Sequence, residues 1–284
     1  MYYTIENEYL SAQIDDMGAQ LHSLVKKEDG FEYLWQGNPD VWYGQAPVLF
    51  PVIGQLKNDI FKYEGKEYPM AKHGFARKML FEAVEVEGAR AVFVLKTNEE
   101  TLKMYPFDFE LSVCFELVGR AIKVTQSVKN LTDKTMYFSM GAHPGFNCKI
   151  GDYLEFEENE VGVQCEKISS DNILMDCFFD VDLENGNRIR LTEDIFNQDA
   201  LILSKLNSSV VTLKSDDHDR AVRFDFGEAP VLGIWAKPNA PYVCIEPWYG
   251  INDEIKGYDD ISQKRGIQSL EPDEDFDLVW IAEV

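Results

Sequence analysis

Hydrophobic and polar residues alternate along much of this chain with a period of two, which is typical of β-strands that bury one face. The clearest example is the run Ala-Ile-Lys-Val-Thr-Gln-Ser-Val at residues 121–128. The same pattern predicts strands at residues 1–14, 17–25, 83–87, 91–95, 109–115, 135–139, 200–203, 210–213, 221–226, 231–235 and 277–281. Only residues 98–104 favour a helix, and a short one.

Short polar connections separate these segments, which favours antiparallel pairing through hairpins. Residues 15–18 predict one such turn, and residues 61–68 predict a small hairpin that turns at Glu64-Gly65. The chain shows no linker, repeat or low-complexity segment. We therefore expect a single all-β domain over residues 1–284, built as a large sandwich of antiparallel sheets.

Prolines interrupt the pattern at two places. Residues 46–54 read Ala-Pro-Val-Leu-Phe-Pro-Val-Ile-Gly, which predicts a buried irregular loop that lines a pocket. The strand at 135–139 is followed by Gly141-Ala142-His143-Pro144-Gly145, and proline cannot continue a central ladder. We expect the chain to leave the sheet here, so that the imidazole of His143 lies at the mouth of a rigid strand. The alternative is a structural histidine whose hydrogen bonds are satisfied at a strand end.

A carboxylate occupies a similar position later in the chain. Residues 241–245 are mostly apolar and lead to Glu246, after which Pro247-Trp248 should end the strand. Burial beside Trp248 should raise the pKa of the Glu246 carboxyl. The pKa values of glutamate and histidine, about 4.3 and about 6.5 in isolation, would then converge near neutral pH. Glu246 and His143 are therefore candidates for a matched acid and base that move protons on a neutral substrate.

Two further histidines and an arginine lie on predicted loops. His73 and Arg77 bracket Gly-Phe-Ala, where the glycine lets the backbone approach a ligand and the guanidinium offers donors to oxygen-rich groups. His218 lies in the acidic segment 215–220, which we interpret as a solvated hairpin tip and not as a metal site. His22 is interpreted as structural.

Composition excludes several classes of function. The formal net charge of −23 over 284 residues argues against binding to nucleic acid or to anionic lipid. No apolar run is long enough to span a membrane, and no signal peptide is visible. The five cysteines form no C-x-x-C pair, which indicates reduced thiols in the cytoplasm.

Four blocks of sequence together resemble the aldose 1-epimerase (galactose mutarotase-like) family, and most closely its LacX-like branch. These blocks are residues 49–54, 73–77, 141–146 and 244–248, in family order. The resemblance implies a β-supersandwich with an open cleft for one sugar, and it implies no metal or other cofactor. Glu246 would act as general base on the anomeric hydroxyl and His143 as general acid on the ring oxygen, so that the ring opens and recloses as the other anomer.

The resemblance also implies a set of substrate contacts. His73, Arg77 and Asp199 would contact the hydroxyls of the sugar, and Trp248 would stack on the pyranose or pack under Glu246. Where many members of the family have an arginine, this chain has Gln55, which donates hydrogen bonds but brings no charge. The partner implied is a small monosaccharide, and the protein would be a monomer or a homodimer.

Four other functions remain open at this stage. A hexose-6-phosphate 1-epimerase would need several cations around the cleft, for which Arg77, Lys57 and Lys72 are the candidates. A non-catalytic sugar-binding protein would not require the acid and the base. A metalloenzyme could use His73, His143 and Glu246 as ligands. A glycoside hydrolase or lyase would need a second carboxylate, for which only Asp199 is available.

Overall fold

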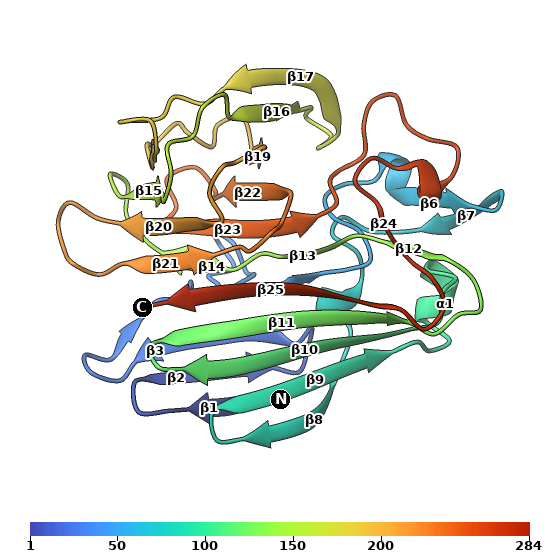
Figure 1. Ribbon diagram of the computed structural model, residues 1–284, viewed down its shortest axis with the longest axis horizontal. Coiled ribbons are helices and arrows are strands. Elements are labelled where there is room, and N and C mark those ends of the chain that lie inside the picture. The colour runs from blue at the N-terminus through green and yellow to red at the C-terminus, as the bar shows by residue number, and fades with distance from the viewer.

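A computed structural model describes all residues from 1 to 284. The chain is almost entirely β, and its strands form three larger sheets and two small ones (Figure 1). The single α-helix, α1, covers only Thr101–Met104, where the sequence predicts a short helix. No helix is therefore long enough or apolar enough to cross a bilayer.

The N-terminal sheet has four strands in chain order, namely β1 (Tyr2–Glu6), β2 (Leu10–Asp15), β3 (Gln20–Lys26) and β4 (Phe31–Glu32). The predicted strand 1–14 is wrong in one respect, because it is divided into β1 and β2. The side chain of Asn7 causes the division: its Oδ1 accepts hydrogen bonds from the backbone N–H groups of Tyr9 and Leu10, both at 2.8 Å. Such a bond competes with the ladder and forms a turn.

The largest sheet has nine antiparallel strands. In spatial order they are β18 (Arg188–Arg190), β15 (Tyr153–Phe156), β20 (Val210–Lys214), β21 (Val222–Asp225), β25 (Asp275–Glu283), β11 (Ala121–Asn130), β10 (Phe109–Val118), β9 (Arg90–Lys96) and β8 (Glu82–Glu87). In β10 and β11 every second side chain is buried, as their alternation predicts.

The third sheet carries the functional residues discussed below. Its spatial order is β17 (Leu174–Asp180), β16 (Gln164–Ile168), β19 (Leu201–Ser204), β22 (Val231–Trp235), β23 (Tyr242–Tyr249), β13 (Met140–Ala142) and β5 (Val48–Leu49), and β14 (Gly145–Asn147) also pairs with β23. β23 is buried over nearly its whole length, which is expected of a central strand with both faces covered.

Two small pairs and three short 3₁₀ helices complete the fold. The pairs are β12 (Met136–Phe138) with β24 (Gln268–Leu270), and β6 (Ile60–Tyr63) with β7 (Lys66–Pro69), whose turn lies at Glu64-Gly65 as predicted. The 3₁₀ helices are η1 (Lys57–Asp59), η2 (Ala76–Lys78) and η3 (Ile261–Gln263).

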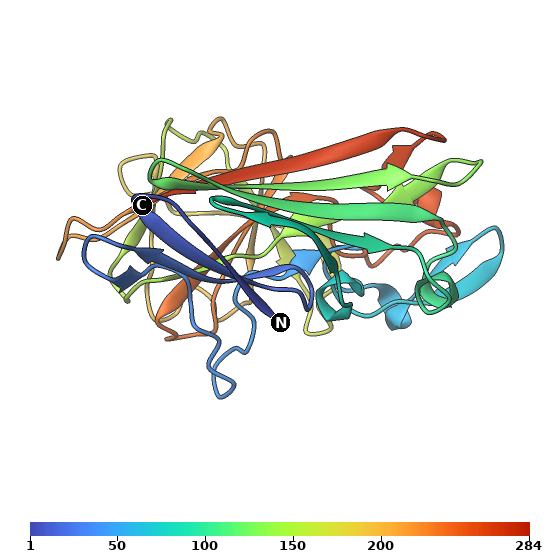
Figure 2. The same ribbon diagram turned by 90° about the horizontal axis from the view of Figure 1, so that it is seen from below.

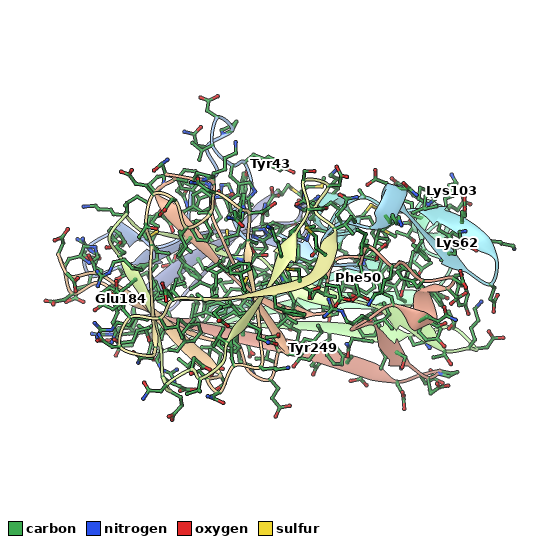
Figure 3. The ribbon with its side chains drawn as sticks, turned by 90° about the horizontal axis from the view of Figure 1, so that it is seen from above. Tyr43, Phe50, Lys62, Lys103, Glu184 and Tyr249 are labelled. Carbon is green, nitrogen blue, oxygen red and sulfur yellow. The ribbon has the colours of Figure 1, made fainter.

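Aromatic side chains join the sheets into one core of 66 buried residues. Phe146 of β14 packs edge-on against Phe224 of β21, with ring centroids 5.8 Å apart, which links the eight-stranded sheet to the nine-stranded sheet. Tyr3 of β1 meets Phe93 of β9 with ring centroids 5.4 Å apart, which joins the N-terminal sheet to the nine-stranded sheet. Figure 2 shows the N-terminal strands in blue against the green strands of this sheet. Figure 3 shows Phe50 inside the molecule and Tyr43 at its outer edge, in agreement with their burial. The fold is therefore an antiparallel β-sandwich, as the sequence predicts.

The predicted strand 135–139 corresponds to β12, which pairs only with β24, and the chain then passes to the eight-stranded sheet at Met140. The prediction that the chain leaves the sheet at Pro144 is wrong, because it stays in the eight-stranded sheet. β13 pairs with β23 through Gly141 and Trp248, and β14 resumes pairing with the same strand through Gly145 and Cys244. His143 and Pro144 lie between β13 and β14; Ile245 N–H donates to the Pro144 carbonyl at 3.2 Å, but Pro144 has no N–H to return the bond. Proline is tolerated because this interruption of the ladder removes the need for its missing donor.

For the same reason β23 does not end at Pro247, which is a second correction. Because backbone donors alternate along a strand, the nitrogen of Pro247 faces the same side as that of Ile245, where the ladder is already broken. β23 therefore continues through Trp248 to Tyr249. Four strands between residues 153 and 190, β15 to β18, were also not predicted, since this region is rich in charged and turn-forming residues.

Candidate active site

A cavity of about 190 Å³ opens where the eight-stranded sheet meets the segment before β5 and the loops that follow β7 and β16. Its lining residues are Trp42, Pro47, Lys72, His73, Arg77, His143, Ile168, Asn172, Asp199, Ala200, Trp235, Glu246, Trp248 and Asn252. Six of the seven residues that the sequence analysis proposes as a site are among them. The exception is Gln55.

His143 and Glu246 face each other across the interrupted ladder. The register of β13 and β14 against β23 is continuous, so His143 lies opposite Glu246, and its Nε2 is 3.3 Å from Oε1 of Glu246. Both side chains are almost fully enclosed, with exposed fractions of 9% for His143 and 2% for Glu246. This distance and this enclosure allow a proton to pass between the two groups.

Burial sets the protonation of the pair. Loss of hydration raises the pKa of the Glu246 carboxyl well above its ordinary value, against the smaller influence of the Trp248 N–H. Burial also lowers the pKa of His143 to about 3. The expectation that the two pKa values converge near neutrality is therefore wrong, because both shifts favour the uncharged forms and move the values past each other. The two shifts together favour a carboxylic acid beside a neutral imidazole, a pair that can share one exchangeable proton.

Trp248 fixes the carboxyl group of Glu246. Its Nε1–H donates to Oε2 at 3.2 Å. The indole is confined by glycines on both neighbouring strands: a Cβ on Gly233 of β22 would lie 2.8 Å from the ring, and one on Gly141 of β13 would lie 3.0 Å from it. The second of the two roles considered for Trp248, packing beside Glu246, is thus the one that its contacts describe.

His73 is held as a hydrogen-bond donor towards the cavity. Its Nδ1 accepts the backbone N–H of Gly54 at 3.2 Å, so the proton of the neutral ring is on Nε2. Burial lowers the pKa of His73 well below its ordinary value, and the nearby His143 adds to this. His73 adopts a left-handed backbone with φ of 64°, and Gly74 follows at 73°. A Cβ on Gly74 would lie 2.1 Å from the Phe50 carbonyl oxygen, which explains the glycine in this loop.

Two cations line the cavity without forming an ion pair. Lys72 donates from Nζ to Oδ1 of Asn172 at 2.6 Å, and Arg77 donates from Nη2 to the Lys72 carbonyl at 2.7 Å. Burial lowers the pKa of Lys72, although Asp199 and Glu246 oppose this. Asn172 is itself held by its carbonyl, which accepts from Nδ2 of Asn252 at 2.8 Å. These bonds tie the tip of the β16–β17 hairpin to the cavity wall.

Asp199 and Gln55 differ in where their side chains point. Asp199 lies on the cavity wall with a left-handed φ of 74°, and its Oδ1 accepts the N–H of Ala200 at 2.8 Å. The amide of Gln55 instead turns away and donates to the Leu56 carbonyl at 2.9 Å and to Oδ1 of Asp59 at 2.6 Å. Gln55 therefore does not line the cavity.

Aromatic residues that the sequence analysis did not single out surround His143. Trp42 stacks on the imidazole with ring centroids 4.9 Å apart at 27°, and Trp235 meets it edge-on at 5.8 Å. Trp42 also stacks on Tyr242 at 5.2 Å. Trp235 ends a predicted strand and could have been proposed, whereas nothing in the sequence around Trp42 distinguishes it from a surface loop.

The chemistry of the donors does not favour a metal. The three residues whose ligand atoms lie within 4.8 Å of one another are His143, Cys244 and Glu246, and His73 is not among them. Burial raises the pKa of both the Cys244 thiol and the Glu246 carboxyl, so both resist the deprotonation that metal binding requires. The arrangement is suited to proton transfer.

The chain is similar in sequence to known proteins over most of its length. Residues 1–256 match the family model described as aldose 1-epimerase. The plasmid-encoded protein LacX of Lactococcus lactis subsp. lactis is 38% identical, over 96% of this chain and 95% of that protein.

Two solved structures are similar to this chain in both sequence and fold. A galactose mutarotase related enzyme from Lactobacillus acidophilus is 36% identical with a TM-score of 0.93, covering 100% of this chain and 97% of the other. A galactose mutarotase-like protein from Lactobacillus casei is 32% identical with a TM-score of 0.95, covering 100% and 99%. The chain thus belongs to the aldose 1-epimerase family.

Proposed function

We propose that this protein interconverts the α and β anomers of a free hexose by general acid/base catalysis. The observation that carries the proposal is the enclosed pair of His143 and Glu246, whose Nε2 and Oε1 atoms lie 3.3 Å apart. Ring opening of a cyclic hexose removes a proton from the anomeric hydroxyl and delivers one to the ring oxygen. A pair that holds one exchangeable proton meets this requirement without any change in its total charge.

The pair gives one proton to the sugar and takes one from it, so protons balance over the reaction. When the sugar enters, the shared proton moves to His143, which leaves Glu246 as a carboxylate. Glu246 then takes the proton of the anomeric hydroxyl while His143 gives its proton to the ring oxygen, and the bond between the anomeric carbon and the ring oxygen breaks. The open-chain aldehyde now faces a protonated Glu246 and a neutral His143. Rotation of the aldehyde and reversal of both transfers give the other anomer.

The remaining polar residues of the cavity would hold the hydroxyls of the sugar. His73 offers an Nε2–H donor, Asp199 offers a carboxylate acceptor, and Lys72 and Arg77 offer further donors. The cavity volume of about 190 Å³ lies below the range of roughly 300–1,000 Å³ found for drug-sized ligands. This supports a single sugar ring as the ligand, in preference to the polymer that a glycoside hydrolase would bind. The five free cysteines fit the cytoplasmic location that we propose.

The test is anomer exchange measured by saturation-transfer NMR with glucose and galactose. We expect accelerated exchange with the wild-type protein and none with Glu246→Gln or His143→Asn. Circular dichroism and thermal unfolding of both variants establish that the fold is retained. The variant Glu99→Gln, which changes an exposed carboxylate with no ion-pair partner, serves as the control. Exchange that survives in both active-site variants would contradict the mechanism.

A hexose-6-phosphate is the second candidate substrate, and one observation favours it. Lys72 and Arg77 line the cavity and neither forms an ion pair with a carboxylate, so both are available to a phosphate dianion. The same NMR experiment with glucose 6-phosphate and galactose 6-phosphate tests this. Acceleration that is confined to the phosphates and lost in Lys72→Met would replace the free hexose as substrate, while the roles of His143 and Glu246 would stand.

A further inference from the structure

A second cavity, of about 390 Å³, lies apart from the first and is about twice its size. The two cavities share no lining residue. The second is formed by Asn147 at the end of β14, by Pro241 just before β23, and by the hairpin of β20 and β21. Its volume falls within the range of sites for small organic molecules.

The floor of this cavity is apolar. Phe31 and Tyr33 meet edge-on with ring centroids 4.9 Å apart, and the side chains of Leu213, Val222 and Pro241 complete the surface. Tyr33 is 3% exposed, so the floor is continuous with the protein core. Such a surface favours the flat or branched apolar part of a ligand.

The rim of the cavity carries basic side chains that no carboxylate holds in close contact. The hairpin tip at 215–220, which the sequence predicts to be merely solvated, places His218 and Arg220 beside the cavity, and Lys149 lies on it as well. Lys149 forms no ion pair, and Nδ1 of His218 has no partner. The guanidinium of Arg220 lies 4.3 Å from the centroid of the Phe31 ring and makes only a loose contact with Asp29, at 3.7 Å.

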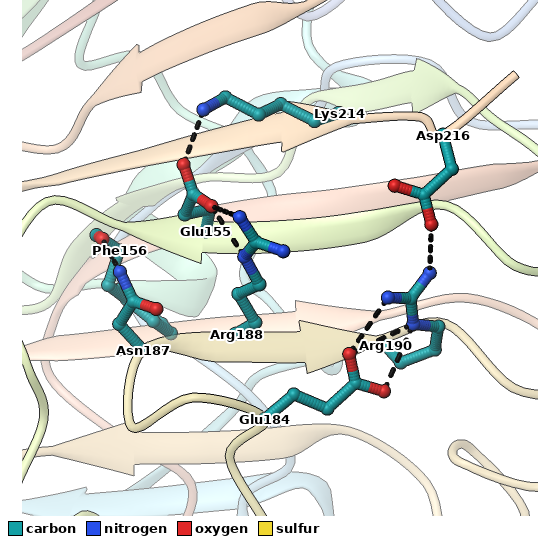
Figure 4. A network of polar contacts seen from close by, with 8 residues as sticks. All are labelled: Glu155, Phe156, Glu184, Asn187, Arg188, Arg190, Lys214 and Asp216. Carbon is teal, nitrogen blue, oxygen red and sulfur yellow. Dashed lines mark hydrogen bonds and ion pairs between the residues drawn. The ribbon is translucent and has the colours of Figure 1, made fainter.

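The neighbouring basic residues differ from these three. Figure 4 shows that Glu155 binds both Lys214 and Arg188, and that Arg190 is held between Glu184 and Asp216. Lys214 also lines the cavity, but its ammonium group is occupied by Glu155. The one carboxylate of the lining, Asp152, is 5% exposed and accepts the backbone N–H of Lys149 at 2.7 Å. In a chain with 50 acidic and 27 basic residues, a rim where Lys149 has no ion-pair partner and Arg220 has only a loose one departs from the average surface.

We propose that this cavity is a second ligand site, specific for a small organic anion with an aromatic or branched apolar body. The apolar body lies on Phe31, Leu213 and Pro241, and the carboxylate or phosphate accepts charge-assisted hydrogen bonds from Lys149 and Arg220. The site is independent of anomer exchange, because its residues lie outside the first cavity.

Titration calorimetry at physiological salt tests the proposal with phenyl phosphate and benzoate as probes. Inorganic phosphate represents the anionic group alone, and benzyl alcohol represents the aromatic group without a charge. We expect at least one aromatic anion to bind tenfold or more tightly than either half, and the tighter of the two identifies the head group. Lys149→Met and Arg220→Gln should each weaken that binding at least tenfold. Both side chains are exposed, so neither change threatens the fold.

The matched control is Lys103→Gln, which removes an exposed cation at the opposite end of the molecule from Glu184 (Figure 3). It should leave binding unchanged. The proposal is overturned if neither aromatic anion binds, or if the double variant of Lys149 and Arg220 binds as tightly as the wild type. It is also overturned if Glu246→Gln abolishes binding, because the probe would then occupy the first cavity.

Discussion

Glu246 places an ionisable side chain in the interior of the protein, which lowers stability as the pH rises. Its carboxyl group is enclosed by β23 and Trp248, and burial raises its pKa well above the ordinary value of 4.5. In the unfolded chain the group ionises as the pH rises through its ordinary pKa, whereas the folded protein retains the proton. The folded state therefore binds more protons than the unfolded state in this range, so the contribution of Glu246 to stability falls as the pH increases.

Replacing Glu246 by Gln should remove this pH-dependent cost. The amide has a similar shape and can still accept the Trp248 N–H, but it cannot ionise in the unfolded state. We expect Glu246→Gln to melt at a higher temperature than the wild type, by a margin that widens from pH 5 to pH 8. Differential scanning calorimetry across this range, with Glu99→Gln as control, is the measurement. A margin that is constant with pH would show that the carboxyl is ionised in the folded protein.

The pH dependence of the reaction follows from the same pair. Burial lowers the pKa of His143 to about 3 and raises that of Glu246, so we expect the pair to keep one exchangeable proton across the mildly acidic and neutral range. His73 adds no titration there, since its pKa is also lowered well below the ordinary value. We expect kcat/KM, corrected for buffer catalysis, to be flat from pH 5 to pH 7. A sigmoidal loss centred near pH 6.5 would indicate that one of these imidazoles is solvated.

At the scale of elements, the geometry of the site depends on two glycines that flank β23. Gly233 of β22 pairs with Glu246, and a Cβ at this position would lie 2.8 Å from the Trp248 ring. Gly233→Ala should displace the indole and lengthen its bond to Glu246. A hydrogen bond to a charged group contributes about 1.5–3 kcal/mol, so kcat should fall roughly ten- to a hundredfold.

A double-mutant cycle distinguishes this effect from general damage to the sheet. Trp248→Phe alone removes the N–H donor and should lower kcat by a similar factor. If Gly233→Ala acts through the indole, it should cause little further loss in the Trp248→Phe background. If the factors by which Gly233→Ala and Trp248→Phe lower kcat multiply in the double variant, then Gly233→Ala does not act through the indole. Kinetics of the three variants and their thermal unfolding complete the cycle.

The elements that the sequence predicted well are those governed by local pattern. The period of two placed β8 to β11, β19 to β22 and β25, and the Glu64-Gly65 turn placed β6 and β7. The effect of the prolines on the strands was harder to predict, because it depends on which backbone N–H groups the neighbouring strand requires as donors. Pro144 and Pro247 lie on facing strands within one interruption of an otherwise continuous register, and no rule about single residues contains that information.

The site was predictable to a similar extent and for similar reasons. His143, Glu246, His73 and Arg77 follow from motifs that lie at strand ends or on glycine-containing loops. Trp42 and Asn172 reach the cavity only through the folding of distant loops, so the local sequence carries no sign of them. Gln55 follows Gly54, which contacts the site, but the amide of Gln55 turns towards Asp59. The direction in which a loop side chain points is set by tertiary contacts.

For the whole molecule, the net charge of −23 creates a field that any ligand must cross. A neutral hexose is indifferent to this field, whereas a hexose phosphate is repelled until salt screens the charges over about 10 Å at 0.1 M. We expect kcat/KM for a free hexose to be unchanged between 20 and 300 mM NaCl, and kcat/KM for any hexose-6-phosphate to rise. A value for the phosphate that falls with salt would mean that Lys72 and Arg77 dominate the approach.

The interrupted ladder between β13, β14 and β23 has one more consequence. It places both reacting groups on adjacent strands of the rigid framework, while Asn172 on the β16–β17 hairpin tip and Asp199 on the loop before β19 form the facing wall. Under the proposed mechanism, the acid/base pair and part of the surface that would hold the sugar therefore lie on different elements. Exchange of the hairpin tip can therefore change which sugar is preferred, while the acid/base pair that carries out the reaction stays the same.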